Sequence, residues 1–168
     1  NEDFNGLEEY LKGLYNAGVD AVIVSDPSVI SLIKEVVPNL EIHISTQQNT
    51  LNYEVCNFWS EEGAKRVVLG RETSKEDMLS ILKNSNIDIE VFIQGAMCVS
   101  YSGRCVLSNY FTNRDSNRGG CSQICRWDFD LYNEKNELLA GDKPFTFCTK
   151  DLSLLKHIPE MIDLGITS

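Results

Sequence analysis

The stretch VDAVIVSDPSVISLIKEVVPNLEIHIST, residues 19–46, carries the pattern that decides the fold class. It opens and closes with short runs rich in β-branched residues, VDAVIVS (19–25) and EIHIST (41–46). Between them, residues 27–37 place apolar side chains three and four positions apart, which is the stripe that a helix buries against a sheet. Pro27 suits a first helical turn, where its missing N–H would have no partner. The stretch therefore predicts a strand, a helix and a second strand.

The same unit is repeated along the first half of the chain. Further strand-like runs are AKRVVLG (64–70) and DIEVFIQ (88–94), so the four runs begin 22, 23 and 24 residues apart. Helical stripes cover residues 50–62 and 74–84, Ser74 with Asp77 resembles a capping box, and Gly18 and Gly63 suit helix C-terminal turns. The pattern predicts an α/β fold of parallel strands alternating with helices. Periodicity alone fits either a barrel or an open doubly wound sheet, and no glycine-rich dinucleotide fingerprint follows any strand.

Composition narrows the class of protein. The chain has 168 residues, of which 42% are hydrophobic, enough for one compact domain. No apolar run approaches the roughly 20 residues that a membrane-spanning helix needs, and the first residues lack the features of a signal peptide. We therefore expect a cytoplasmic protein with no membrane partner.

Charge is distributed unevenly. The net charge is −10, which argues against a surface that binds nucleic acid everywhere. Residues 98–127, however, carry +3, and we call their four arginines the basic island. Guanidinium groups bind RNA phosphates or a dicarboxylate in a bidentate manner, whereas the alternative is ordinary solvated loop charge. The island consists of Arg104, Arg114, Arg118 and Arg126.

Six cysteines without a secretory signal favour metal or redox chemistry over a disulfide framework. Cys56 stands apart, on a helical stripe. The other five fall within 51 positions: Cys98, Cys105, Cys121, Cys125 and Cys148. Thiolates that converge on one point hold iron–sulfur clusters, and four of them hold structural zinc equally well. The remaining alternative is that these side chains are small buried hydrophobes or turn residues.

The regular repeat breaks after Ala96, and the segment that follows carries a resemblance to a known family. EVFIQGAMCVSYSGRCVLS (90–108), NRG (117–119), CSQICRW (121–127) and KDL (150–152) resemble the signature of peptidase family U32. The resemblance implies a TIM-type βα-barrel in which a cysteine-rich module follows the seventh strand. This chain would then supply the fourth to seventh strands, with a barrel part at 1–97, a cysteine-rich module at 98–148 and a helix returning to the barrel at 149–168. The sequence pattern places that helix at residues 151–164.

The resemblance also implies an activity. The family is named for collagenase-like peptidases, but relatives act in prephenate-dependent hydroxylation of the tRNA wobble uridine, in ribosomal RNA hydroxylation and in oxygen-independent ubiquinone hydroxylation, and they carry iron–sulfur clusters. We expect an RNA hydroxylation enzyme with a 4Fe–4S cluster. The alternatives are a metal- or thiol-dependent peptidase and a non-enzymatic metal-binding accessory protein. No His-Glu-x-x-His or Gly-x-Ser-x-Gly motif supports the peptidase, and His43 and His157 are the only histidines.

The ligands implied by the resemblance are Cys98, Cys105 and Cys121. Relatives often place a fourth cysteine where this chain has Ser153, so either Cys148 or Cys125 would take its place. Purification in air would leave such a site zinc-filled or empty.

Residues at the carboxyl ends of the strands are candidates for a catalytic site, because barrel enzymes carry their sites there. The alternative for each of them is an ordinary capping or loop residue with no catalytic role. Relatives frequently have histidine at the position of Gln94, which weakens a general-base role for it. Tyr101, Tyr110 and Trp127 either stack on bases or shield a cluster. The strand-end candidates are Ser25, Asp26, Thr46, Gln47, Arg71, Glu72 and Gln94, of which Arg71, Glu72 and Gln94 are the catalytic ones.

Four strands of a barrel cannot close on themselves. The chain should therefore form a partial parallel sheet with helices on one side and two unpaired edges. Exposed apolar surface of this kind is usually buried by association, so we expect chains to self-associate through the open face or edges. A complete eight-stranded barrel, or an antiparallel sheet from the same four segments, would contradict this interpretation.

Overall fold

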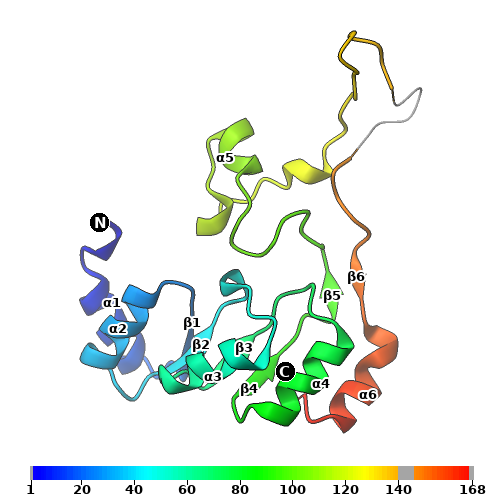
Figure 1. The fold of residues 1–168 in the computed structure, drawn as a ribbon. Helices are drawn as coiled ribbons and strands as arrows, with labels where there is room; N and C mark the ends of the chain where they lie inside the picture. The colour runs from blue at the N-terminus through cyan, green and yellow to red at the C-terminus, as the bar shows by residue number, and fades with distance from the viewer. Residues whose placement is uncertain (1, 140–145, 167–168) are drawn as a thin grey trace. The chain divides into compact units, whose positions relative to one another are not determined.

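The computed structural model describes residues 2–139 and 146–166, and the chain divides into two units (Figure 1). Unit 1 comprises residues 1–92 and 156–168, and unit 2 comprises residues 93–155. Each unit has its own small sheet. The boundaries expected from the sequence, after residues 97 and 148, stay a prediction.

Unit 1 is built on a four-stranded parallel sheet whose strands follow chain order. Every pair is parallel, and the pairing starts from Ala21 opposite Glu41 and continues with His43 opposite Arg66 and Arg66 opposite Asp88. The α/β class expected from the sequence is confirmed, and each strand is shorter than its β-rich run. The strands are β1 (Ala21–Val24), β2 (Glu41–Ile44), β3 (Arg66–Val68) and β4 (Asp88–Glu90).

Helices connect these strands, and the expected caps are confirmed. The carboxylate of Asp26 accepts the N–H of Ser28 at 2.7 Å at the start of α2, and Ser74 accepts the N–H of Asp77 at 3.1 Å at the start of α4. Gly18 and Gly63 have φ angles of 81° and 85°, the left-handed conformation that ends a helix. The helices are α1 (Leu7–Asn16), α2 (Pro27–Val36), α3 (Tyr53–Glu61), α4 (Lys75–Asn84) and α6 (Ile158–Asp163).

The core of unit 1 lies between the sheet and its helices. Ile33 of α2, Cys56 of α3 and Ile81 of α4 are fully buried, and they belong to one apolar cluster with Ile44 and Val67 from the strands. Because alternate strand residues point to opposite faces, this cluster accounts for one face of the sheet.

The other face carries a different set of side chains. Ile23, His43, Arg66 and Asp88 lie opposite one another across the four strands. Ile23 is 61% exposed, and Arg66 contacts Asp88 at 3.8 Å. The edges of the sheet are β1 and β4, and neither pairs with a further strand in the described residues. A partial parallel sheet with open edges is thus observed in unit 1, and no barrel closes within the described part of the chain.

Unit 2 consists mainly of loops. Its two-stranded sheet pairs β5 (Gln94–Gly95) antiparallel with β6 (Leu152–Ser153). A short helix, α5 (Leu107–Thr112), and two 3₁₀ turns, Ser116–Arg118 and Ile124–Arg126, form its middle part. Ile124 and Ser108 are almost fully buried.

One expected element is wrong in its bounds. The sequence pattern favours a helix over residues 151–164, whereas the structure has β6, a 3₁₀ turn (Leu155–His157) and then α6, which begins only at Ile158. Backbone pairing of Leu152 and Ser153 with Gly95 and Gln94 supersedes helical propensity there, and Pro159 occupies the first turn of the shorter helix. None of the described helices is long and apolar enough to cross a membrane.

Candidate functional site

The carboxyl ends of the unit 1 strands are tied together by hydrogen bonds from the loops that follow them. The Gln48 side chain donates to the carbonyl of Ser25, and Thr46 Oγ1 donates to the carbonyl of Leu69 at 3.1 Å. The N–H of Gly70 donates to the carbonyl of Thr50, also at 3.1 Å. These contacts give the loops after β1, β2 and β3 a fixed arrangement, which is what a site on this edge needs.

Most of the strand-end candidates cap helices or form turns, whereas Arg71 stacks on an aromatic ring. Asp26 caps α2, and Thr46 and Gln47 lie in the 3₁₀ turn after β2. The guanidinium of Arg71 lies 4.0 Å from the ring centre of Phe92, and no carboxylate of the described residues forms an ion pair with it. A stacked guanidinium keeps its N–H edge available for an anion.

The three catalytic candidates do not belong to one unit. Arg71 and exposed Glu72 follow β3 in unit 1. Gln94 lies in unit 2, where it is exposed and pairs with Ser153. A catalytic role for any of them stays a prediction.

Five of the six cysteines lie in unit 2, and the thiol of Cys125 interacts with three of the others. Burial raises the pKa of the Cys125 thiol most, and the neighbouring thiols of Cys98, Cys121 and Cys148 raise it further. A hydrogen bond from the backbone N–H of Val99 acts in the opposite direction. Charge interactions of this kind require proximity, so these four cysteines come from three loops to one region of unit 2.

Backbone contacts hold this group in place. The N–H of Cys148 donates to the carbonyl of Cys125 at 2.8 Å, which joins the two segments that supply the candidate fourth ligand. Thr146 Oγ1 lies 3.5 Å from the Cys148 sulfur, and the N–H of Gln123 donates to the Cys121 sulfur at 3.4 Å. These contacts tie the sulfurs of Cys148 and Cys121 to neighbouring residues.

Cys105 has a different environment. Its carbonyl accepts hydrogen bonds from Ser116 Oγ at 2.8 Å and from the side-chain amide of Asn117 at 3.3 Å, which anchors it to the 3₁₀ turn at Ser116–Arg118. Its thiol is not among those that raise the pKa of Cys125. Among residues 2–139 and 146–166, no three Cys, His, Asp or Glu side chains are arranged to hold a metal ion. The soft donor set suits iron and sulfide chemically, but the described thiols do not form a closed site.

The four arginines of the basic island differ in whether they form an ion pair among the described contacts. Arg126 forms an ion pair with Asp151, which raises the pKa of the guanidinium, and so its charge is balanced locally. Arg104 and Arg114 have no ion pair among the described contacts. Arg118 ends the 3₁₀ turn at Ser116–Arg118. The island therefore presents its net positive charge mainly through the loops on either side of α5.

Pattern analysis missed a set of aromatic side chains that only the fold brings together. Phe111, Phe129 and Phe147 form consecutive ring contacts, with Tyr110 packed against Phe111. No periodic signal could identify them, because Phe111 lies in α5 whereas Phe129 and Phe147 lie in two separate loops.

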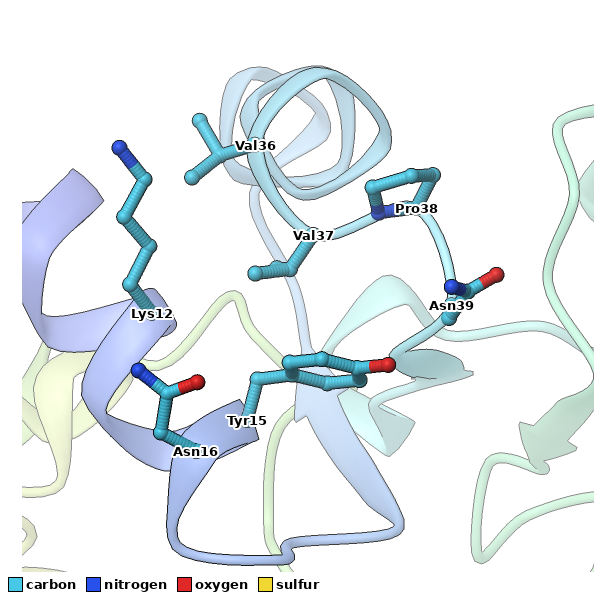
Figure 2. A pocket seen from close by; sticks show the side chains of 7 residues that line it. All are labelled: Lys12, Tyr15, Asn16, Val36, Val37, Pro38 and Asn39. Atoms are coloured by element: carbon cyan, nitrogen blue, oxygen red, sulfur yellow. The ribbon is translucent and has the colours of Figure 1, made fainter.

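A pocket of about 320 Å³ lies between the end of α1 and the turn that follows α2 (Figure 2). Tyr15 extends across it below Val37, and Pro38 and Asn39 close one side. Its only titratable cation, Lys12, is 2.5 Å from Glu8. The pocket contains neither a thiol nor a strand-end candidate, and we assign it no role in the site.

The comparisons with known proteins decide the family. The family model of peptidase family U32 matches residues 1–168. The chain belongs to peptidase family U32. Within the family it is 52% identical to tRNA hydroxylation protein P1 of Bacillus subtilis, over 100% of this chain and 41% of that protein. No solved structure matches the chain.

Two other U32 relatives show how widely the names in the family differ. A 23S rRNA 5-hydroxycytidine synthase of Escherichia coli is 33% identical over 100% of this chain and 25% of its own length. A protein of Methanocaldococcus jannaschii named as an uncharacterised protease is 39% identical over 96% of this chain and 41% of its own length. The chain thus spans between 25% and 41% of the length of these three relatives.

Proposed function

We propose that the full-length protein containing this chain hydroxylates tRNA at the wobble uridine in a prephenate-dependent reaction, and that the thiols of unit 2 hold an iron–sulfur cluster for it. The observations that carry the proposal are the hydrogen bond that joins Cys148 to Cys125 and the charge interactions of Cys125 with the thiols of Cys98, Cys121 and Cys148. U32 relatives named for tRNA and rRNA hydroxylation support the choice of substrate. Such a protein acts where tRNA is, in the cytoplasm.

The cluster would be of the 4Fe–4S type, and Cys98 and Cys121 are ligands in every version of the proposal. Cys105 completes the set implied by the family signature, with Cys148 or Cys125 as the fourth thiolate. Thr146 would orient the Cys148 sulfur, and the Val99 N–H would do the same for Cys125. When bound, a cluster of this type supplies one-electron chemistry. Zinc in its place, or an empty site, would follow aerobic purification.

For the fold of the whole protein, the proposal includes a βα-barrel. Four parallel strands in chain order, each joined to the next by a helix on one face, are the arrangement that consecutive strands of such a barrel adopt. Unit 1 would supply four of the eight strands, and the loops of unit 2 would follow the last of them.

RNA would be bound through the basic island of unit 2. Arg104 and Arg114, which lack ion pairs among the described contacts, are the side chains best placed to contact phosphate. Arg126 would keep Asp151 in place beside the thiols.

A peptidase is the alternative suggested by the family name, but the described geometry lends it no support. His43 lies 3.6 Å from Glu41, and His157 lies 3.6 Å from Glu160. Neither histidine is hydrogen-bonded to a serine or cysteine in the described part of the chain, as a nucleophile and its base would require.

The proposal is tested by purifying the full-length protein without oxygen and incubating it with unmodified tRNA, with and without prephenate. We expect absorbance from thiolate-to-iron charge transfer, and hydroxylated wobble uridine in digested tRNA only when prephenate is present. A protein that contains iron but yields no hydroxylated nucleoside from tRNA would refute the substrate, and one that hydroxylates tRNA without iron would refute the cofactor.

A further inference from the structure

Unit 2 contains a continuous row of four aromatic rings, which we call the aromatic row: Tyr110, Phe111, Phe129 and Phe147. The ring centres of Tyr110 and Phe111 are 5.1 Å apart, those of Phe111 and Phe129 are 5.8 Å apart, and those of Phe129 and Phe147 are 5.0 Å apart. The planes meet at 85°, 60° and 71°, so the outer two pairs contact by their edges and the middle pair is tilted. Edge contacts of this kind hold each ring in position while leaving part of its face uncovered.

The row is exposed rather than buried. Tyr110 is 82% exposed, Phe111 is 48% exposed and Phe147 is 42% exposed, whereas Phe129 is partly buried beneath its neighbours. A contiguous group of exposed apolar side chains indicates a binding surface, whereas single exposed apolar residues are normal.

The charged side chains of unit 2 indicate what kind of molecule binds to the aromatic row. Unit 2 contains seven basic and seven acidic side chains, so unit 1 carries the whole net charge of −10. Within unit 2, Arg104 and Arg114 flank α5 in the chain, and Arg114 follows Tyr110 by four residues. Exposed rings and arginines such as Arg104 and Arg114, which have no ion pair among the described contacts, are the combination that binds single-stranded nucleic acid, through base stacking and phosphate contacts.

The row and the thiols occupy the same small unit. Phe147 directly precedes Cys148, whose N–H donates to the carbonyl of Cys125, and Phe129 follows four residues after Cys125. A base stacked on the row would therefore be held by the same loops that hold the reactive sulfurs.

We propose that the aromatic row is the platform on which unpaired bases of the RNA substrate stack, with Tyr110 and Phe111 as the main stacking side chains and Arg114 as a phosphate contact. This inference rests on the proposed function in taking RNA as the substrate, and it adds the recognition of single-stranded bases by named rings. An RNA loop fits this surface, whereas a fully paired helix offers no open base face to it.

The experiment measures binding of the full-length protein to a fluorescent anticodon stem–loop, by anisotropy, over a range of salt concentrations. Tyr110→Ala and Phe111→Ala should each weaken binding by about tenfold at every salt concentration, because stacking is worth roughly 1–3 kcal/mol per base and does not release counterions. Tyr110→Phe should bind normally, because it keeps the ring. Arg114→Ala should instead reduce the slope of log K against log salt by about one.

Tyr10→Ala is the matched control, because Tyr10 lies on α1 of unit 1, is 62% exposed and should have no effect on binding. Unchanged affinity in Tyr110→Ala and Phe111→Ala would overturn the proposal. So would a loss of binding that Tyr110→Leu does not reproduce, or one accompanied by a lower melting temperature, since the row would then be packing against protein. Ring-dependent binding without any hydroxylation would overturn the proposed function and leave the platform standing, and hydroxylation with ring-independent binding would do the reverse.

Discussion

At the scale of single residues, the thiols of unit 2 are chemically distinct from Cys56. Cys56 is completely buried in the core of unit 1, whereas Cys98 and Cys121 are exposed in unit 2. Replacing Cys98, Cys105 or Cys121 by Ser should abolish iron binding, because an iron–sulfur cluster requires thiolate ligands. Cys56→Ser should keep the iron. Iron and sulfide content after anaerobic purification would check this, and iron retained by the triple variant would refute the assignment.

The pair Cys125 and Cys148 allows the fourth ligand to be identified in the same measurement. Only one of Cys125→Ser and Cys148→Ser should lose iron completely, while the other should keep most of it with a shifted absorbance. Sequence reasoning left this choice open because this chain has Ser153 where relatives often have the fourth cysteine. The fold joins them by one backbone hydrogen bond, and no local pattern encodes such a contact.

Burial also predicts how Cys56 reacts. Desolvation raises the pKa of its thiol to about 11, so little thiolate exists at pH 8, and the side chain has no exposed surface. In iron-free protein at pH 8, iodoacetamide should modify the cysteines of unit 2 much faster than Cys56, with peptide mapping by mass spectrometry as the measurement. Rapid modification of Cys56 before unfolding would contradict the packing described for α3.

At the scale of elements, the cap of α4 makes a quantitative prediction. Ser74 Oγ accepts the N–H of Asp77 at 3.1 Å and donates to its carboxylate at 2.6 Å. Ser74→Ala should lower the free energy of unfolding by about 1 kcal/mol, because an N–H at the helix start loses its partner. Ser80→Ala, within the same helix, is the control and should be neutral or slightly stabilising, because alanine has the higher helix propensity. Urea unfolding followed by circular dichroism measures both, and equal effects would contradict the cap.

The elements of unit 1 could be predicted from the sequence because each rests on local information. Apolar periodicity, the caps at Asp26 and Ser74 and the glycine turns are all encoded within a few residues of where they act. Unit 2 lacks such information. The pairing of Gln94 with Ser153 joins residues far apart in the chain, and it is this pairing that shortens the helix expected over residues 151–164.

At the scale of the whole molecule, the open sheet of unit 1 predicts association. Ile23 is exposed on the face opposite the core, and β1 and β4 are unpaired edges among the described residues. The 168-residue chain alone should therefore sediment as species larger than a monomer, with a weight-average mass that rises with concentration. Ile23→Lys should reduce this association by placing a charge on the open face. A chain that remains monomeric at every concentration would contradict the prediction.

The central claim is that the thiols of unit 2 serve RNA hydroxylation, and tRNA itself provides the most direct test. Cells that lack the gene would be complemented with the full-length protein, with a Cys98→Ser, Cys121→Ser double variant or with Cys56→Ser, and tRNA nucleosides would be measured by mass spectrometry. The account predicts that hydroxylated wobble uridine returns with the unaltered protein and with Cys56→Ser, and stays absent with the double variant. Full hydroxylation by a stably expressed double variant would contradict it.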